Sequence, residues 1–446
     1  MSSRCFALVL GLLGVALLSV GCDATARRVR TDLCLRCNVV VVSFDTLRAD
    51  HVGFHGYRRP TTPSLDRLAA RGVVFANAIS QSAWTRPAHA SMFTGLYPSE
   101  HGLVAVDRNV ALDPRQPMLA SVLRANGYAT AAFTGGGNMS AHFGFDAGFE
   151  TYRSPGRRLA DGLTDVEAWL DTVADRPFFL FVHGYDAHRP YRSTAEDRAA
   201  IGIGPTPPSM GINRACREAR GPADLAPYVD EYDAAIHHGD RAIGRLLDSL
   251  ARRGRMDDTV VVVTSDHGEE FLEHGTCFHI RSLYREIVHV PLVYYVPGVD
   301  ARRVPQLVPA SVSLAPTILD IVGVGKRLRE GPSLAAFLDG RRVPTFDYVV
   351  SETAIRYPGR RYGHVRALTG ERDKLIRWTL EQRHEYFDLT TDPGETRPER
   401  QAARARPLLR HLDLWLAAHP PRDVVVAATR MPVRLREELR ELGYVE

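Results

Sequence analysis

A threonine at the start of a predicted helix is the first residue of this chain that is placed to do chemistry. Thr85 lies two positions before Pro87 in the run AWTRPAHASMFTG, and Gly95 closes that run. Proline suits the first turn of a helix and glycine its end, so Thr85 is expected at or just before a helix N-terminus. Backbone N–H groups and the positive end of the helix dipole favour a bound anion there, which places the alcohol to attack a phosphate or a sulfate. The alternative is that Thr85 only caps the helix.

Two carboxylates and an imidazole follow strand-like runs of valine. NVVVVSFD ends at Asp45, and TVVVVTSDHGEE contains Asp266 and His267. Continuous apolar runs bounded by polar residues predict strands buried on both faces, and catalytic groups of open parallel sheets collect at the carboxyl ends of such strands. These groups and Thr85 are therefore expected to meet at one sheet edge, where they can hold a metal ion and activate a nucleophile. Separately, Asp45 could cap a turn, and Asp266 with His267 could form a hydrogen-bonding pair.

The elements that must position these residues alternate between helix and strand. Helical spacing occurs in TPSLDRLAARG, SVLRANG, DGLTDVEAWLDTVAD and YDAAIHHGDRAIGRLLDSLARRG, and short apolar runs occur in ATAAFTG, PFFLFVHGYD, VVVVTSD and PLVYYVPG. This alternation predicts an α/β fold with a large, mainly parallel sheet and helices on both faces. Residues 192–224 show no periodicity and are expected to form a long surface excursion near the site.

Length and composition predict one large domain with a small satellite. The chain has 446 residues, of which 45% are hydrophobic and 24% charged, and its net charge of +4 is too small to indicate nucleic-acid binding. Short strands such as DYVVSETAI and EYFDLTTDPGE, then an arginine-rich helical tail, predict a small C-terminal α+β subdomain at 344–446 after a catalytic domain at 38–343.

The N-terminus has the features of an export signal. Residues 1–21 contain one basic residue and an apolar stretch shorter than the ~20 residues of a spanning helix. The run LSVGC resembles a bacterial lipobox and predicts cleavage before Cys22 and lipidation of its sulfur, with plain secretion or an uncleaved anchor as alternatives. Residues 22–37 then form a linker, and the protein is expected in the bacterial cell envelope, held to the membrane by its lipid.

Four further cysteines would remain after export. Outside the cytoplasm, Cys34 can pair with Cys37 and Cys216 with Cys277, and free thiols are the alternative. A zinc ribbon is excluded because the chain has no second CxxC motif.

Several separated blocks resemble the sulfatase-like branch of the alkaline phosphatase superfamily. They extend from about residue 38 to 395 and include NVVVVSFDTLRADHVGFHGYRRPTTPSLDRLAARG, TRPAHASMFTGLYPSEHG, HGYDAHRPY, TSDHGEEFLEHG and SLYREIVHVPLVYYVPG. The resemblance implies an α/β sandwich and a metal-assisted attack on a tetrahedral ester. It implies that Asp45, Asp266 and His267 are metal ligands and that Thr85 is both the nucleophile and a fourth ligand.

The resemblance also indicates histidines around the transferred group. Charged family positions fall at or near His89, His183, His188 and His279, which would bind substrate, with His279 and His188 as the candidates that protonate the leaving alkoxide. The alternative for each is a structural histidine. Weaker candidates are His274, Asp186, Asp240, His237 and His238. Asp186, together with His188, could contribute to a second metal site.

The chain departs from the family pattern at the nucleophile. Family sulfatases carry Cys or Ser there and convert it to formylglycine, but the extra methyl of Thr85 prevents formation of the aldehyde. A simple alcohol requires water to attack the intermediate, and phosphorus accepts that attack more readily than sulfur does. Superfamily relatives that use threonine act on phosphodiesters. We therefore expect a phosphoester hydrolase or transferase, acting on a phosphodiester or a phosphonate ester through a covalent Thr85 intermediate, without formylglycine.

The predicted metal site also differs from that of the sulfatases. A second carboxylate and an amide of the family are replaced by Thr46 and His267, and an imidazole favours Mn²⁺ or Zn²⁺, with Ca²⁺ or Mg²⁺ still open. The expected partner is a phosphorylated or sulfated small molecule, lipid or glycan. The alternatives are a sulfuric ester hydrolase without formylglycine and a non-catalytic lipoprotein that binds such a glycan.

Overall fold

The computed structural model describes most of the chain after the predicted signal peptide. The described residues are 33–105, 109–173, 176–204, 208–325, 328, 331–340, 345–356, 362–399, 403–422 and 425–444. They belong to one compact unit, Thr31–Glu446. The signal peptide, Cys22 and the linker up to residue 32 lie outside the described residues. None of the described helices combines the length and the apolar composition that crossing a bilayer requires.

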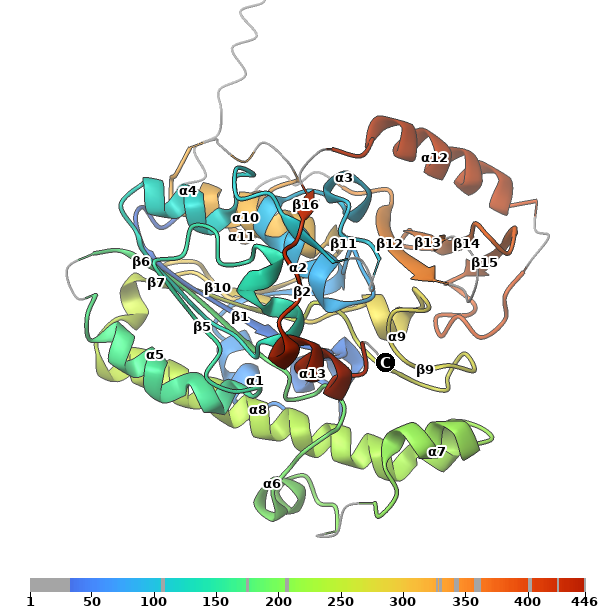
Figure 1. Ribbon diagram of the computed structural model, residues 1–446, viewed down its shortest axis with the longest axis horizontal. Coiled ribbons are helices and arrows are strands. Elements are labelled where there is room, and N and C mark those ends of the chain that lie inside the picture. The colour runs from blue at the N-terminus through green and yellow to red at the C-terminus, as the bar shows by residue number, and fades with distance from the viewer. Residues whose placement is uncertain are drawn as a thin grey trace, which may run out of the picture. The chain divides into compact units, whose positions relative to one another are not determined.

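An eight-stranded sheet forms the centre of the molecule (Figure 1). Its strands, in spatial order, are β11 (Arg302–Pro309), β2 (Val73–Ile79), β10 (Leu292–Tyr295), β7 (Thr259–Thr264), β1 (Asn38–Phe44), β6 (Phe178–Gly184), β4 (Ala129–Phe133) and β5 (Thr151–Arg153). β10 runs antiparallel to both of its neighbours, and every other adjacent pair is parallel. The prediction of a mainly parallel sheet is confirmed.

The valine run of β1 lies between two layers of helices. Successive strand side chains point to opposite faces, so Val39 and Val41 pack in one apolar cluster, and Val40 and Val42 pack in another. Helices α2 (Thr85–Thr94), α4 (Leu119–Ala125) and α10 (Ser311–Ile321) contribute to the first cluster, and α1 (Pro63–Ala69), α5 (Leu163–Leu170) and α8 (Ala226–Arg252) to the second (Figure 1). All four valines are at most 1% exposed, as expected for a strand that is covered on both faces.

Shorter elements connect and extend these layers. They are β3 (Val110–Leu112), β8 (Glu270–Phe271), β9 (Cys277–Phe278), α3 (Pro98–His101), α9 (Arg285–Val288), α11 (Ala335–Leu338), and the 3₁₀ helices η1 (Ala49–His51), η2 (Gly53–His55), η3 (Gly137–Met139), η4 (Ala141–Phe143), η5 (Leu159–Gly162), η6 (Pro222–Leu225) and η7 (Met256–Asp258).

A second, antiparallel sheet follows the main one along the chain. Its strands are β12 (Val349–Arg356), β13 (Tyr362–Thr369), β14 (Asp373–Trp378) and β15 (Arg383–Asp388), and α12 (Ala405–Ala418) packs on it through Leu408 and Leu412. Bridges from β12 to Ser82 and Ala105 join this sheet to the main body. The large sheet and this small one confirm the predicted fold class.

The excursion over residues 192–224 contains short helices that the sequence analysis did not predict. These are α6 (Ala195–Ala200), α7 (Ile212–Glu218) and η6. The Asp197 carboxylate of α6 contacts His237 and His238 of α8, and a disulfide joins Cys216 of α7 to Cys277. Elements this short depend on tertiary contacts rather than on their own propensity, so they leave no readable periodicity. A second disulfide joins Cys34 to Cys37, so both candidate pairings are present.

The last described segment returns to the main body and forms a separate two-stranded sheet there. β16 (Val425–Ala427) pairs with β3, and α13 (Val433–Glu441) follows it. Leu435, Leu439 and Leu442 are at most 5% exposed and join the same apolar cluster as α2. This segment therefore packs in the core that includes α2 rather than on the small antiparallel sheet.

Candidate active site

The carboxyl ends of three adjacent parallel strands bring the predicted residues together. β1 lies between β7 and β6, with Ser43 paired to Thr264 on one side and to His183 on the other. Asp45 follows directly after β1, and Asp266 two residues after β7. This register places both carboxylates and His183 at one edge of the sheet, as the strand-end rule predicts.

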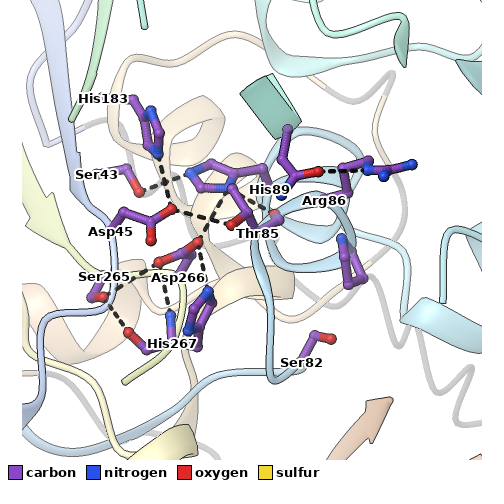
Figure 2. Close-up of polar contacts among 12 residues, drawn as sticks. Ser43, Asp45, Ser82, Thr85, Arg86, His89, His183, Ser265, Asp266 and His267 are labelled. Carbon is purple, nitrogen blue, oxygen red and sulfur yellow. Dashed lines mark hydrogen bonds and ion pairs between the residues drawn. The ribbon is translucent and has the colours of Figure 1, made fainter. Parts of the chain in front are cut away.

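Helix α2 presents the threonine hydroxyl to this edge. Trp84 is the N-cap residue and no side chain caps the helix, so Thr85 is the first helical residue. Its Oγ1 donates to Asp45 Oδ2 over 3.2 Å, and the whole residue is buried. The interpretation of Thr85 as a simple N-cap is therefore wrong, because its hydroxyl is directed to the carboxylate cluster (Figure 2).

Asp45, Asp266 and His267 form a cluster that could hold a metal ion. One potential ligand atom from each residue lies within 4.8 Å of the others, and no other group of three His, Cys, Asp or Glu side chains within the described residues does so. A second metal site with Asp186 and His188 is thus not formed by such a group. Asp186 instead accepts a hydrogen bond from the backbone N–H of Leu159.

Each ligand residue is held through one atom, and its other polar atom remains for a cation. Asp45 Oδ2 contacts Thr85 and His183, Asp266 Oδ1 accepts from the backbone of His267, and His267 Nδ1 donates to the Gly268 carbonyl. Asp45 Oδ1, Asp266 Oδ2 and His267 Nε2 are buried and have no hydrogen-bond partner. Buried polar atoms without partners are costly, so this set fits a divalent cation, and the Nδ1 contact fixes the tautomer that exposes Nε2.

Burial and neighbouring charges shift the pKa values of all three residues in the cluster. Burial raises the pKa of the Asp45 carboxyl well above its usual range, and the Asp266 carboxylate raises it further. Burial also opposes ionisation of Asp266, but His267, His89 and His183 outweigh that effect and lower its pKa to about 2. At His267 the two carboxylates outweigh burial and raise the pKa. A bound cation would neutralise the repulsion between the two carboxylates.

Two of the predicted histidines hold the cluster in place. His89 contacts Ser43 Oγ through Nε2 and the Thr85 carbonyl through Nδ1, both over 2.8 Å, and His183 Nε2 contacts Asp45 Oδ2 over 3.2 Å (Figure 2). The Gly135 backbone N–H donates to the other ring nitrogen of His183. Burial lowers the pKa of His89 to about 3 and that of His183 to about 4. Because both nitrogens of each ring are engaged within the protein, these histidines are placed to orient Asp45 and the helix start.

The other two predicted histidines reach Thr85 only through the hydroxyl of Tyr444. His279 Nδ1 lies 2.8 Å from Glu269 Oε1, and His188 Nδ1 lies 2.6 Å from the Arg189 carbonyl oxygen. Their ring centroids are 5.1 Å apart, and burial lowers the pKa of both imidazoles. Both Nε2 atoms contact the hydroxyl of Tyr444, at 2.9 Å from His279 and 3.4 Å from His188.

The weaker sequence candidates lie outside this cluster. His274 pairs with Glu286 and stacks on Tyr284. Asp240 accepts hydrogen bonds from the backbone N–H groups of Ser64 and Leu65 at the start of α1. His237 and His238 contact Asp197, as described above.

Two residues of the site were not predicted. Glu269 belongs to the run DHGEE, in which only Asp266 and His267 were predicted to be site residues. Tyr444 contacts Thr85 Oγ1 over 3.0 Å although 359 positions separate them in sequence. No local pattern marks Tyr444, and only the path of the last segment brings it to the site.

The Sulfatase family model matches residues 37–324, which is more than half of the chain. The chain therefore belongs to the sulfatase family, and the predicted resemblance to sulfatase-like proteins of the alkaline phosphatase superfamily is confirmed.

Named relatives and solved structures agree with this assignment. The chain is 25% identical over 408 residues to the Delta 4,5-hexuronate-2-O-sulfatase of Bacteroides thetaiotaomicron, covering 80% of this chain and 83% of that protein. It is 27% identical over 399 residues to the multifunctional alkaline phosphatase superfamily protein PehA of Trinickia caryophylli, covering 68% and 77%. The phosphonate monoester hydrolase of Agrobacterium radiobacter shares the fold, with a TM-score of 0.64, 20% identity, and coverage of 86% of this chain and 94% of that one.

Proposed function

We propose that this sulfatase-family protein is a metal-dependent phosphoester hydrolase or transferase with Thr85 as its nucleophile. The observation that carries the proposal is the Thr85 hydroxyl, which lies 3.2 Å from Asp45 Oδ2 at the N-terminus of α2. A metal-ligand cluster and a helix N-terminus both favour an alcohol that attacks an anionic ester at this point.

The residue type favours phosphorus over sulfur. Threonine cannot become formylglycine, so the covalent intermediate is resolved when water or another alcohol attacks the transferred group. Phosphorus accepts this second attack more readily. The Agrobacterium radiobacter structure is named a phosphonate monoester hydrolase, and PehA is named multifunctional, so the fold and the wider superfamily are compatible with phosphorus chemistry.

In the proposed reaction, Thr85 Oγ1 passes its proton to Asp45 Oδ2 and bonds to phosphorus, the bond from phosphorus to the ester oxygen breaks, and that oxygen departs with a proton from His279 or His188. Asp45, Asp266, His267 and Thr85 would hold the cation, for which the imidazole favours Mn²⁺ or Zn²⁺ over Ca²⁺ or Mg²⁺. When bound, such a cation lowers the pKa of the alcohol and neutralises developing charge.

His279 and His188 are the proposed proton donors. An anionic ester beside them would raise their depressed pKa values, so that Nε2 takes up a proton, since Nδ1 of each ring already donates to an acceptor. Water then gives a proton to the imidazole that lost one and attacks phosphorus, the bond to Thr85 Oγ1 breaks, and this oxygen takes its proton back from Asp45.

Hydrolysis of a sulfuric ester without formylglycine is the second candidate. It is favoured by the name of the Bacteroides relative, a hexuronate-2-O-sulfatase, which aligns over 80% of this chain.

A panel of p-nitrophenyl esters separates these functions. Metal-loaded wild type and Thr85→Ala would be compared on a phosphodiester, a phosphomonoester, a phosphonate and a sulfate. The proposal predicts release from the phosphodiester or phosphonate in the wild type only. Preferential, Thr85-dependent sulfate release would support the second candidate, and ligand binding that persists without metal or turnover would support a non-catalytic binder.

We further propose that the protein is exported and lipid-anchored at Cys22, and that its substrate is an envelope lipid or a glycan. The LSVGC run and the glycan named for the relative support this proposal. Labelling of cells with a fatty-acid analogue tests it, because Cys22→Ser should abolish incorporation into the full chain.

A further inference from the structure

The last described segment closes over the nucleophile. Its three buried leucines anchor α13 in the core beside η3, and Glu438 Oε2 accepts from the Gly137 backbone N–H over 3.1 Å. Gly443 then turns with φ at +82°, so close to Arg189 that a Cβ atom there would lie 2.3 Å from the guanidinium. This turn directs Tyr444 into the site.

The Tyr444 phenol lies where a substrate must react. Its oxygen is 3.0 Å from Thr85 Oγ1, 2.9 Å from His279 Nε2 and 3.4 Å from His188 Nε2. A reacting atom must approach to about 3–3.5 Å from the nucleophile, which is the distance that the phenol oxygen already occupies. Tyr444 is 7% exposed and Thr85 is fully buried. An ester and the Tyr444 side chain therefore cannot occupy this position together.

The phenol ring extends from this position like the leaving group of an aryl or sugar ester. Its centroid lies 6.3 Å from that of Trp84, 5.8 Å from His188 and 5.7 Å from His279. These three side chains surround the place of the Tyr444 ring, here called the Tyr444 slot, and the Nε2 atoms of the two histidines contact the phenol oxygen.

An arginine-rich cavity adjoins this slot. It has a volume of 240 Å³, and its lining includes Arg157, Arg158, Arg189 and Arg192 together with Asp161, Asp186 and His188. Glu441 and Leu442 form its wall on the side of the last segment, and the Glu441 carboxylate lies 2.6 Å from Arg157. Withdrawal of the segment would join the cavity to the slot and leave arginines where Glu441 had been.

We propose that Glu441 and Tyr444 are an internal mimic of the leaving group, and that the substrate is an ester of a ring alcohol that bears a further acidic group. The ring takes the Tyr444 slot, and the acidic group takes the place of Glu441 beside Arg157. The segment must withdraw before substrate binds, so it also holds the free enzyme closed. This inference rests on the proposed function, because it assigns a leaving-group site to that reaction.

Binding of two small phenols to the full-length protein tests the mimic directly. The probes are 4-hydroxyphenylacetate, which has a carboxylate, and p-cresol, which has none. Isothermal titration calorimetry would compare wild type, Tyr444→Ala and Tyr444→Phe. We expect Tyr444→Ala to bind 4-hydroxyphenylacetate at least about tenfold more tightly than the other two, because their slot remains filled. Tyr444→Phe is the matched control, since it keeps the ring and loses only the hydroxyl.

The acidic group is tested by a second substitution. In a Glu441→Ala, Tyr444→Ala background, which also empties the place of the acidic group, Arg157→Gln should remove most of the preference for 4-hydroxyphenylacetate over p-cresol and leave the affinity for p-cresol unchanged. Equal binding by wild type and Tyr444→Ala, or no binding by Tyr444→Ala, would overturn the inference. So would a loss of kcat on p-nitrophenyl esters in both Tyr444 variants, which would make the phenol part of the catalytic machinery. If Tyr444→Ala bound 4-hydroxyphenylacetate tightly but turned over no ester, the inference of a binding site at Tyr444 would stand and the proposed function would be rejected.

Discussion

At the scale of single residues, Asp45, Asp266 and His267 form the cluster that suits a divalent cation. The protein holds each of them through one atom and leaves its second polar atom without a hydrogen bond, although Asp266 Oδ2 and His267 Nε2 lie 3.3 Å apart as an ion pair. Such an arrangement is unfavourable by itself, because buried carboxylates repel one another and unpaired polar atoms lose their hydration. It becomes favourable when a divalent cation supplies the missing interactions.

This arrangement predicts opposite effects of Asp45→Asn with and without metal. The amide removes one negative charge next to Asp266, so we expect a higher Tm than wild type in the presence of a chelator. With Mn²⁺ at about one hundred times its Kd, wild type should gain about 2.7 kcal/mol of unfolding free energy, and the variant should gain much less.

Thermal melts with chelator and with added Mn²⁺ measure both effects. Asp186→Asn is the control, because that carboxyl is also buried but contacts a backbone amide outside the cluster. An equal Mn²⁺-dependent gain in wild type and Asp45→Asn would contradict the assignment of Asp45 as a ligand.

At the scale of elements, helix α2 is held in position by His101, which lies outside the metal-ligand cluster. His101 of α3 is fully buried, contacts the Pro87 carbonyl and Ser91 Oγ through Nε2, and accepts from the Leu103 backbone N–H. Burial lowers its pKa to about 3, so the imidazole stays neutral in the folded protein while it takes up a proton below about pH 6.5 in the unfolded chain.

The His101 contribution to stability should therefore be lost as the solution becomes more acidic. It is present above pH 6.5 and decreases as pH falls toward the folded pKa, by on the order of 2 kcal/mol between pH 7 and pH 5. Urea denaturation in the presence of a chelator should show His101→Gln less stable than wild type at pH 7 and the gap narrowing by this amount at pH 5. A gap that does not change with pH would show that the imidazole is not buried in its neutral form.

The sequence predicts an element well when the residues that determine it are neighbours in the chain. The valine runs of β1 and β7 are local, and with the strand-end rule they placed Asp45, Asp266 and His267 together. The neighbouring sequence cannot decide whether Thr85 caps the helix or acts as a nucleophile, because the answer depends on which distant groups its hydroxyl contacts. The short helices α6 and α7 are stabilised by α8 and by a disulfide, and Tyr444 reaches the site only through the turn at Gly443.

At the scale of the whole molecule, a disulfide connects two distant parts of the chain near the site. Cys216 and Cys277 are separated by 61 positions, and Cys277 lies two residues before His279. A cross-link over this length restricts the unfolded chain and is worth about 4 kcal/mol in the chain-entropy account, against about 2 kcal/mol for a loop of four residues.

Loss of this disulfide should destabilise the protein much more than loss of the short one. We expect the double variant Cys216→Ser and Cys277→Ser to have a clearly lower Tm than wild type, and Cys34→Ser with Cys37→Ser to show about half of that effect. Thermal melts under oxidising conditions measure both, and a reductant should bring wild type down toward the variants. Equal melting temperatures of wild type and the first variant would indicate that this cross-link does not stabilise the fold.

The central claim is a covalent bond between Thr85 and phosphorus, and a single-turnover experiment tests it most directly. Metal-loaded wild type, Thr85→Ser and Thr85→Ala would be mixed with substoichiometric bis(p-nitrophenyl) phosphate, quenched at short times, and digested for mass spectrometry of the α2 peptide. The account predicts a p-nitrophenylphosphoryl group on residue 85 in wild type and, at a different rate, in Thr85→Ser, with neither adduct nor nitrophenol release in Thr85→Ala. Release of nitrophenol by Thr85→Ala at the wild-type rate, with no adduct on the wild-type peptide, would contradict it.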